Sequence, residues 1–412
     1  MWPKPYCLLI LTVFAILGVA DPVLSQGPAE EGTLPALKIK GTKIIDADGK
    51  PVLLRGVNLG NWLLLESHFS GFAFKDEKSL WNGLQTRLGA ERMRAIREAF
   101  RAAWITADDF ERIKKLGFNH VRVPFWFGLL EDDERPGKYR DDGWAWLDNA
   151  VEWSEKAGLY CVLDMHGLPG GQSKADHSGE KDRNAYWSDA RLQKRTLDLW
   201  TAIAKRYKGR NSIAAFDLMN EPMGAPDART MIAAQFTLLR AIRKVDPNRL
   251  VVVEDGYKGL QNFAKLTAPD KGGVIFSQHH YPTLTAPATP DVHEAFFRDK
   301  FPQFAKEQAR FDQPLYIGEW NVIQEAAGGG PMARKHIEQM EARGWSWALW
   351  TYKQSNKDPV RECWSLYRNN KALDLPNLEQ DGAEKIITKF ALLKTENMVI
   401  YEPMQKAVTG EK

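Results

Sequence analysis

The stretch Ala214-Ala215-Phe216-Asp217-Leu218-Met219-Asn220-Glu221-Pro222, residues 214–222, decides the fold. It begins with a short apolar run of the length of a buried parallel strand, and it continues directly into an amide and a carboxylic acid. Seven similar runs occur elsewhere along the chain, at Leu53–Asn58, His120–Pro124, Tyr160–Met165, Leu250–Glu254, Val274–His279, Leu315–Gly318 and Trp345–Trp350. The chain therefore contains eight candidate strands.

Segments with helical periodicity separate these runs. The clearest are Ala107–Leu116, Trp146–Ala157, Arg191–Tyr207, Thr230–Val245 and Pro331–Arg343. Glycines follow several helices closely, as C-terminal caps do, at Gly117, Gly158 and Gly344. Eight strands in strict alternation with helices predict an α/β fold of the TIM-barrel type, (β/α)8, and favour it over an open doubly wound sheet.

The N-terminal part of the chain adds two features to the predicted barrel. Leu37–Ile45, a turn at 46–49 and Val52–Val57 predict a hairpin that closes the barrel floor and leads into the first strand. The insert Ser67–Arg101 extends the loop that follows this strand. Because no second linker occurs later in the chain, we expect one catalytic domain over residues 37–405.

The first twenty residues predict a secretory signal peptide. Lys4 precedes an apolar run from Leu8 to Leu17, and small residues follow at 18–20. The run is short for a bilayer span, and an uncleaved N-terminal anchor is the alternative. Residues 21–36 are rich in proline, glycine and glutamate, which predicts a flexible leader. We therefore expect a secreted or periplasmic protein.

The composition restricts the classes of partner. Of 412 residues, 44% are hydrophobic and 26% are charged, which argues against a disordered chain and a polytopic membrane protein. The net charge is only +3 and the basic residues are scattered, so we expect no nucleic acid and no stable membrane partner. The 15 tryptophans favour a carbohydrate ligand, although many of them belong to the core. Cys161 and Cys363 alone cannot form a disulfide framework.

Polar and ionisable residues gather at one end of the predicted strands. They cluster where the apolar runs end and not where they begin, as the catalytic face of a barrel requires. In chain order they are Asn58, Arg122, Asp164 with His166, Asn220 with Glu221, Glu254 with Asp255, His279 with Tyr281, Glu319 and Trp350. This one-sided distribution predicts an active site at the barrel mouth.

Two glutamates carry the catalytic hypothesis. Glu221 follows the fourth run and Glu319 follows the seventh, so barrel closure is expected to bring both carboxyl groups into one cleft. Retaining glycoside hydrolases use such a pair about 5 to 5.5 Å apart, one group as nucleophile and the other as acid/base. The alternative is that each glutamate merely pairs with a neighbouring arginine.

Six short motifs at the strand ends occur in one order along the chain. They are Arg122 in His120-Val121-Arg122-Val123-Pro124, His166 in Asp164-Met165-His166-Gly167, Asn220-Glu221-Pro222, His279-His280-Tyr281, Gly318-Glu319-Trp320 and Trp350 in Leu349-Trp350-Thr351. Together, over residues 55–352, they resemble glycoside hydrolase family 5, a retaining (β/α)8 family of the cellulase superfamily. The resemblance implies Glu221 as general acid/base and Glu319 as nucleophile. It also implies substrate-binding roles for Arg122, His166, Asn220, His279, Tyr281 and Trp350, with Trp350 as the floor of the −1 subsite.

The chemistry adds expectations about protonation. Glu319 has to be ionised to attack, and we expect Arg122 and a hydrogen bond from Tyr281 to favour that form. Glu221 has to begin protonated, and we expect partial burial near an ionised Glu319 to raise its pKa. Asn220 suits the 2-hydroxyl of the sugar.

Two further stretches concern the choice of glycan. The first is Asn58-Leu59-Gly60-Asn61-Trp62-Leu63-Leu64-Leu65-Glu66, and the second is His166-Gly167-Leu168-Pro169-Gly170-Gly171-Gln172 followed by Asp176-His177-Ser178-Gly179. They resemble the exo-β-1,3-glucanase-like members of the family, which implies that Glu66 and Asp176 bind the terminal sugar. For Glu66, a solvated loop charge is the alternative. Ala175 and Leu284 replace the aromatic residues that clamp the next sugar in those relatives, which predicts a more open +1 subsite. The insert after the first strand either forms another wall of this subsite or only packs against the rest of the domain.

We therefore expect a retaining β-glycoside hydrolase that cleaves β-glucans, exo-acting on β-1,3-glucan or on β-glucosides by double displacement. An endo-acting β-1,4-glucanase or mannanase and a non-catalytic glycan-binding barrel are the alternatives. We expect no cofactor and no metal: His166, His279, His280 and the two glutamates are candidate zinc ligands, but no His-x-His follows the first run. The expected partner is a β-glucan or β-glucoside oligosaccharide, bound by a monomer.

Overall fold

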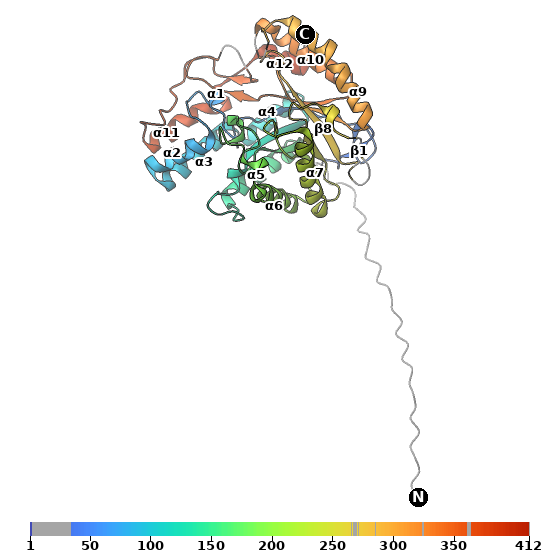
Figure 1. Ribbon diagram of the computed structural model, residues 1–412. Helices are drawn as coiled ribbons and strands as arrows, with labels where there is room; N and C mark the ends of the chain where they lie inside the picture. The colour runs from blue at the N-terminus through green and yellow to red at the C-terminus, as the bar shows by residue number, and fades with distance from the viewer. Residues whose placement is uncertain are drawn as a thin grey trace. The chain divides into compact units, whose positions relative to one another are not determined.

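A closed parallel barrel forms the centre of the fold. In this computed structural model the strands pair in the order β10-β3-β4-β5-β6-β7-β8-β9 and close on themselves. Their bounds are β3 Arg55–Asn58, β4 His120–Trp126, β5 Tyr160–Gly167, β6 Ile213–Asp217, β7 Val251–Glu254, β8 Val274–His280, β9 Leu315–Trp320 and β10 Ser346–Leu349. Each predicted run overlaps one of these strands, which confirms the TIM barrel (Figure 1).

The structure describes Met1 and residues 34–411, apart from positions 265, 267–269, 271, 285, 324 and 361–363. The predicted signal peptide, most of the predicted leader and Cys363 therefore lie outside the described residues. Cys161 is buried in β5. None of the described helices combines the length and the apolar character needed to cross a bilayer.

Outside the insert after β3, seven α-helices of the described residues connect the strands from β3 to β10. They are α4 Ala107–Lys115, α5 Asp141–Lys156, α6 Ala190–Arg206, α7 Ala228–Val245, α8 Pro290–Asp299, α9 Phe301–Phe311 and α10 Gly329–Glu341. Side-chain caps fix where some of them begin, because a capping carboxylate accepts from a free N–H group of the first turn. The Asp227 carboxylate accepts from the backbone N–H of Thr230, so α7 begins two residues before the predicted start. Five of the seven overlap the predicted helical segments, whereas α8 and α9 were not predicted.

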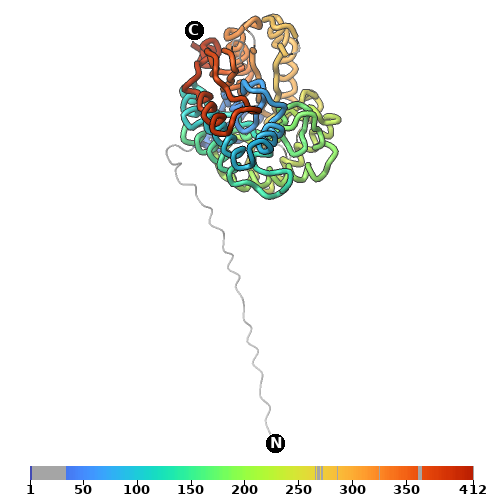
Figure 2. The backbone as a smooth tube through the Cα atoms, turned by 90° about the vertical axis from the view of Figure 1, so that its left-hand side faces the viewer, coloured from blue at the N-terminus to red at the C-terminus, as the bar shows by residue number. Residues whose placement is uncertain are grey.

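The insert after β3 is helical and packs against the C-terminal segment. It contains α1 Ser67–Ser70, α2 Glu77–Leu88 and α3 Ala90–Trp104, and the chain ends with α11 Ala383–Phe390 and α12 Glu402–Thr409. Helices α3 and α11 are in contact, and Figure 2 shows the red C-terminal segment beside the blue insert. The rings of Phe72, Phe100 and Phe390 lie 5.2 to 6.1 Å apart. Much of the insert therefore serves packing. A small sheet of β11 Lys353–Gln354, β12 Tyr367–Arg368 and β13 Val399–Ile400 lies outside the barrel sheet.

A hairpin of β1 Lys38–Lys40 and β2 Lys43–Ile45 closes the barrel floor. Leu37 and Ile44 join one apolar cluster with side chains from the barrel strands, which confirms the predicted plug. The hairpin of β1 and β2 turns at 41–42, where Gly41 adopts a left-handed φ of 59°, and this turn was not predicted. The predicted turn at 46–49 is confirmed, because Ile45 forms an antiparallel bridge with Pro51 and the Val52 backbone N–H donates to the carbonyl of Ile44.

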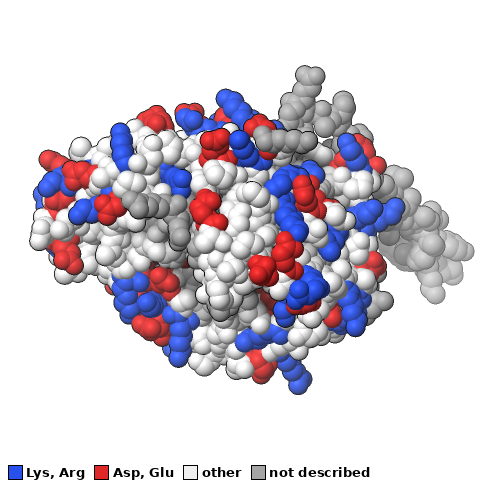
Figure 3. All heavy atoms as spheres, turned by 90° about the horizontal axis from the view of Figure 1, so that it is seen from above, with Lys and Arg blue, Asp and Glu red and all other residues white. Residues whose placement is uncertain are grey.

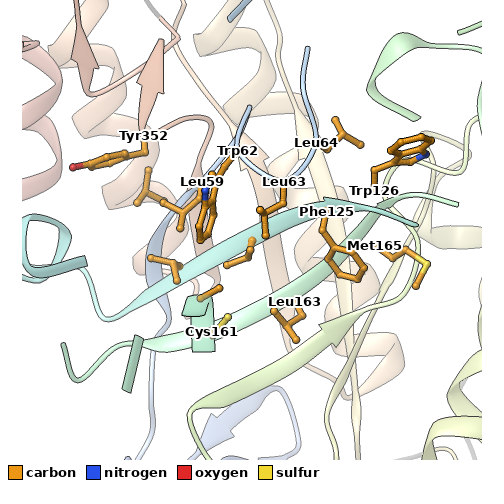
Figure 4. Packing of buried hydrophobic residues seen from close by; sticks show 14 of the residues in the cluster. Leu59, Trp62, Leu63, Leu64, Phe125, Trp126, Cys161, Leu163, Met165 and Tyr352 are labelled. Atoms are coloured by element: carbon orange, nitrogen blue, oxygen red, sulfur yellow. The ribbon is translucent and has the colours of Figure 1, made fainter. Parts of the chain in front are cut away.

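The segment between β3 and Glu66 is fixed by packing against the barrel wall. Leu59, Trp62 and Leu63 are fully buried, and Figure 4 shows them over the side chains of β4 and β5. The Trp62 indole N–H also donates to the carbonyl of Arg101, 3.1 Å away.

On the face shown in Figure 3, Lys and Arg side chains are interspersed with Asp and Glu.

Candidate active site

Arg122 of β4 organises the hydrogen bonds at the barrel mouth. Its fully buried guanidinium donates hydrogen bonds of 2.8 to 3.1 Å to Asn58, Asp217, Asn220, Glu254 and Glu319. Burial alone lowers the pKa of Arg122, but four carboxylates outweigh it and raise this pKa well above its ordinary value. The permanent cation thus ties together side chains from several barrel strands.

Glu319 of β9 is held at both carboxylate oxygens. Arg122 Nη1 donates to Oε1 over 2.8 Å, and the Tyr281 hydroxyl donates to Oε2 over 2.8 Å. Gly318 makes room for the neighbouring His279 ring, because a Cβ at this position would lie only 2.7 Å from His279 Nε2. Two donors and 4% exposure give the oriented, partly desolvated carboxylate that a nucleophile requires.

Glu221 lies in the loop after β6, close to Glu319 of β9. It adopts a left-handed φ of 39°, uncommon for a residue with a side chain and frequent at functional sites. Its backbone N–H donates to Glu254 Oε2 over 2.7 Å, which holds this conformation. Carboxylate oxygens of Glu221 and Glu319 and a ring nitrogen of His279 lie within 4.8 Å of one another. Such a close approach of the two carboxylates is what a retaining pair, with carboxyl groups about 5 to 5.5 Å apart, requires.

The protonation of Glu221 differs from the sequence-based expectation of a raised pKa. Burial does raise the pKa, but the hydrogen bond from His279 and the charges of His177 and His279 lower it below its ordinary value. Burial lowers the pKa of His279, yet Glu254 and Glu319 raise it well above its ordinary value. His279 Nδ1 lies 2.9 Å from Glu221 Oε1, and this contact favours the charged form of each group. The Glu221–His279 pair is therefore the candidate proton donor of the site.

His166, Asn220 and Trp350 form a second group of predicted site residues. His166 Nδ1 lies 2.6 Å from Asp164, so its Nε2 accepts from the Asn220 amide at 3.1 Å. Asn220 Oδ1 accepts from Arg122, which orients the remaining Asn220 N–H for a ligand. The Trp350 ring stacks on His166 with centroids 5.4 Å apart and an angle of 16°.

Glu66 is buried, and the alternative of a solvated loop charge is wrong. It is only 6% exposed, and Oε1 has no hydrogen-bond partner among the described residues. Burial, and then the charges of Asp176, Glu319 and Glu221, raise its pKa well above the ordinary value. Asp176 begins the short helix η2 Asp176–Ser178 and is partly exposed. The structure thus brings all ten predicted site residues to one end of the barrel.

Sequence reasoning missed His177 and Tyr257. His177 Nδ1 lies 3.3 Å from Glu221 Oε2, and the Tyr257 hydroxyl donates to Glu221 Oε1 over 2.8 Å. A signal existed for both, because His177 follows Asp176 and Tyr257 lies just after the strand-end acids of β7. Trp364, whose ring lies 5.4 Å from that of Tyr281, follows no barrel strand, and no spacing pointed to it.

His280 does not belong to the site. Its ring lies 4.9 Å from that of Phe296 and 5.5 Å from that of His336, outside the barrel. Among the described residues, Glu221, His279 and Glu319 form a cluster with the spacing of metal ligands. All three belong to the histidines and glutamates considered as metal ligands from the sequence. Their donor atoms take part in hydrogen bonds between His279 and Glu221 and with Arg122, Tyr257 and Tyr281.

A cavity of about 620 Å³ lies behind the loop that carries His177. Its described lining includes Lys78 and Trp126 and none of the predicted site residues. The Lys78 backbone N–H donates to the carbonyl of Gly179 over 3.1 Å, two residues from His177. The lining of this cavity is therefore tied to the loop that carries His177.

Comparison with known proteins agrees with the geometry. The family model "Cellulase (glycosyl hydrolase family 5)" matches residues 74–356. A beta-xylosidase of Phanerodontia chrysosporium is 32% identical over 62% of this chain and 54% of its own length, so the match spans about half of that relative. A probable glucan 1,3-beta-glucosidase A of Aspergillus fumigatus is 29% identical over 76% of this chain and 72% of its own length.

A solved structure supports the fold alone. The rutinosidase of Aspergillus niger superposes with a TM-score of 0.61 at 18% identity, over 76% of this chain and 92% of its own. The family model covers well over half of the chain and includes both glutamates. The chain therefore belongs to glycosyl hydrolase family 5.

Proposed function

We propose that this protein is a retaining β-glycoside hydrolase that acts on β-glucans or β-glucosides by double displacement. The observation that carries the proposal is the close approach of Glu221 and Glu319, within 4.8 Å, with different partners around each carboxyl group. A non-catalytic glycan-binding barrel has no need for two carboxylates at this separation.

In the first step Glu319 attacks the anomeric carbon of the bound sugar. The bond from that carbon to the leaving oxygen breaks, and the leaving oxygen takes the proton of the Glu221–His279 pair. Protein and sugar are then joined by an ester bond at Glu319. The second hydrogen on the Asn220 amide faces the sugar 2-hydroxyl, where contacts strengthen as positive charge develops on the ring.

In the second step Glu221 acts as a base. It takes a proton from water, the resulting hydroxide attacks the anomeric carbon, and the ester bond to Glu319 breaks. Two displacements at one carbon retain its configuration. The proton taken from water restores the Glu221–His279 pair, whose atoms lie 2.9 Å apart, for the next turnover.

We further propose exo action on the non-reducing end. Glu66 and Asp176 support it, because a buried Glu66 and a partly exposed Asp176 beside the −1 position can form hydrogen bonds with terminal hydroxyls and oppose passage of a longer chain. The name of the Aspergillus relative, a probable glucan 1,3-beta-glucosidase, supports β-1,3-linked glucan as a substrate.

Product analysis on laminarin, lichenan, cellulose and mannan tests both parts. Exo action is expected to release only glucose at early times, and product of retained configuration is expected by NMR. Early mixtures of oligosaccharides would contradict the exo proposal and favour the endo alternative. Absence of hydrolysis on all glycans and on aryl β-glucosides would contradict the proposed activity.

We also propose export by a cleaved signal peptide and action as a monomer. The charged and apolar pattern of residues 1–20 supports cleavage. Sequencing of the mature N-terminus is expected to begin near Asp21, and an intact N-terminus would favour the anchor alternative. Light scattering is expected to give one chain per particle, and a dimer mass would contradict the monomer.

A further inference from the structure

Three exposed apolar side chains lie on consecutive loops of the barrel mouth. Met223 follows β6, Tyr257 follows β7 and Leu284 follows β8, and these strands are neighbours in the barrel. The three side chains are 37%, 51% and 55% exposed. Among the described residues, the other large hydrophobic side chains of such exposure are Met1, Leu392 and Val399. We call Met223, Tyr257 and Leu284 the apolar rim.

Tyr257 joins the apolar rim to the acid/base. Its hydroxyl donates to Glu221 Oε1 over 2.8 Å, while about half of the residue is exposed. Gly256 and Tyr257 both have left-handed backbones, with φ of 54° and 59°, and the Tyr257 N–H donates to Asp255 Oδ1. The Lys258 ammonium donates to the carbonyl of Met223 over 3.2 Å, which links this loop to the loop after β6. The ring is thus held at a fixed place beside Glu221.

The chemistry of Glu221 decides which part of a substrate meets this surface. Glu221 protonates the leaving oxygen, so the group attached to that oxygen has to lie beside Glu221. Glu66 follows β3 and Asp176 follows β5, whereas the three residues of the apolar rim follow β6, β7 and β8. The leaving group therefore meets the apolar rim at Tyr257, whose hydroxyl is bonded to Glu221.

We propose that the apolar rim is a leaving-group subsite that selects β-glucosides with an apolar alkyl or aryl leaving group. The proposal rests on the proposed hydrolysis of β-glucosides. The side chains of Met223 and Leu284 cannot donate hydrogen bonds to the hydroxyls of a second sugar, and Ala175 offers no ring to clamp one. An alkyl or aryl group instead removes its own apolar surface and that of the rim from water. Each methylene buried completely is worth about a fourfold gain in affinity.

The test compares hexyl β-glucoside with methyl β-glucoside, since both release an alkanol of similar reactivity. For the full chain, kcat/KM for the hexyl substrate is expected to exceed that for the methyl substrate at least tenfold. In Tyr257→Ala and Met223→Ser this ratio is expected to fall to about two or less. Tyr257→Phe keeps the ring and removes the hydroxyl, so its ratio is expected to stay high while its pH profile shifts. Leu392→Ser, at an exposed apolar side chain far along the chain, is the matched control and is expected to keep the ratio.

Two results overturn different claims. A hexyl-to-methyl ratio near one, or a high ratio that survives Tyr257→Ala and Met223→Ser, overturns the leaving-group subsite and leaves the proposed hydrolase intact. No turnover of any alkyl or aryl β-glucoside overturns the proposed function itself, and the subsite with it.

Discussion

The side chains of two adjacent histidines on β8 face opposite sides of the barrel wall. His279 faces inward, 2.9 Å from Glu221, 3.3 Å from Glu254 and 3.6 Å from Glu319. His280 faces outward, among aromatic rings of the helical layer. Burial lowers the pKa of both, but the three carboxylates reverse the effect for His279, whereas the pKa of His280 falls to about 3.

Two adjacent side chains on the neighbouring strand β9 also face opposite sides of the barrel wall. Glu319 faces inward to Arg122 and Tyr281, while Trp320 is fully buried outside and stacks on His336 with centroids 5.5 Å apart. Since side chains alternate along a strand, one position serves catalysis and the next serves packing. A substitution at an inner position should therefore lower activity, and a substitution at the neighbouring outer position should lower the free energy of unfolding.

The largest effect is expected inside, at Glu319→Ala. Loss of the nucleophile should lower kcat at least about 10⁴-fold, which corresponds to about 5 kcal/mol or more in activation free energy. The melting temperature should not fall, because a charge buried among other carboxylates is removed. Azide should restore turnover with an activated aryl glucoside as a glycosyl azide. Glu325→Ala, at an exposed glutamate of the same loop, is the control, and an active Glu319→Ala enzyme would contradict the assignment.

Trp320→Ala tests the outer face directly beside that position. Removal of this fully buried indole should reduce the free energy of unfolding by about 3 to 5 kcal/mol. Denaturant unfolding measures this loss. The kcat of the protein that remains folded should change by only a few fold. A stable but inactive variant would show that the two faces are not separated as described.

Glu221→Ala should distinguish the acid from the nucleophile. Alkyl glucosides need protonation of the leaving oxygen, so their turnover should fall by about 10² to 10³-fold. An aryl glucoside with an acidic phenol needs little protonation and should lose much less in its first step. Steady-state and burst kinetics on the two substrates measure this difference. Equal losses on both would show that Glu221 is not the acid.

A smaller effect, on the free energy of unfolding, is expected when the pH is lowered, because His280 and His293 are buried outside the barrel. The pKa of His280 is lowered to about 3 and that of His293 to about 4, in each case chiefly by burial, and the ion pair of Glu294 with Lys335 faces this cluster. Because these folded pKa values lie below the unfolded value of about 6.5, the unfolded chain binds protons first. Stability is therefore full above about pH 6.5 and is lost as the pH falls below it, by about 2 kcal/mol for His280 between pH 7 and 5.

The variant His280→Leu tests this pH dependence. Both ring nitrogens of His280 lack a hydrogen-bond partner among the described residues, so the substitution sacrifices no polar contact. Melting curves between pH 7 and 5 should show a shallower loss of stability than in the wild-type protein. An unchanged slope would contradict the burial of a neutral His280.

The sequence was sufficient for the barrel and for the carboxylate pair, for a physical reason. Apolar runs of strand length and polar residues at their C-terminal ends are local patterns, and barrel closure brings Glu221 and Glu319 together. The additional turn at 41–42 was missed, because a single left-handed glycine, Gly41, interrupts an otherwise strand-like run.

The protonation of the site also required three-dimensional information. The pKa of Glu221 depends on His177 and His279, which come from the loop after β5 and from β8. The contact of Tyr257 with Glu221 depends on a left-handed loop conformation that its residue type does not announce. Charges from distant parts of the chain and the conformations of loops produce no periodic pattern in the sequence.

Trapping of the covalent intermediate tests the central claim most directly. The protein is incubated with a 2-deoxy-2-fluoro-β-glucoside that carries a good leaving group, and the adduct is located by mass spectrometry of peptides. We predict one fluoroglucosyl group per chain, on the peptide and the side chain of Glu319. An adduct on Glu221 or Glu66, or turnover without any adduct and with inverted product, would contradict the account.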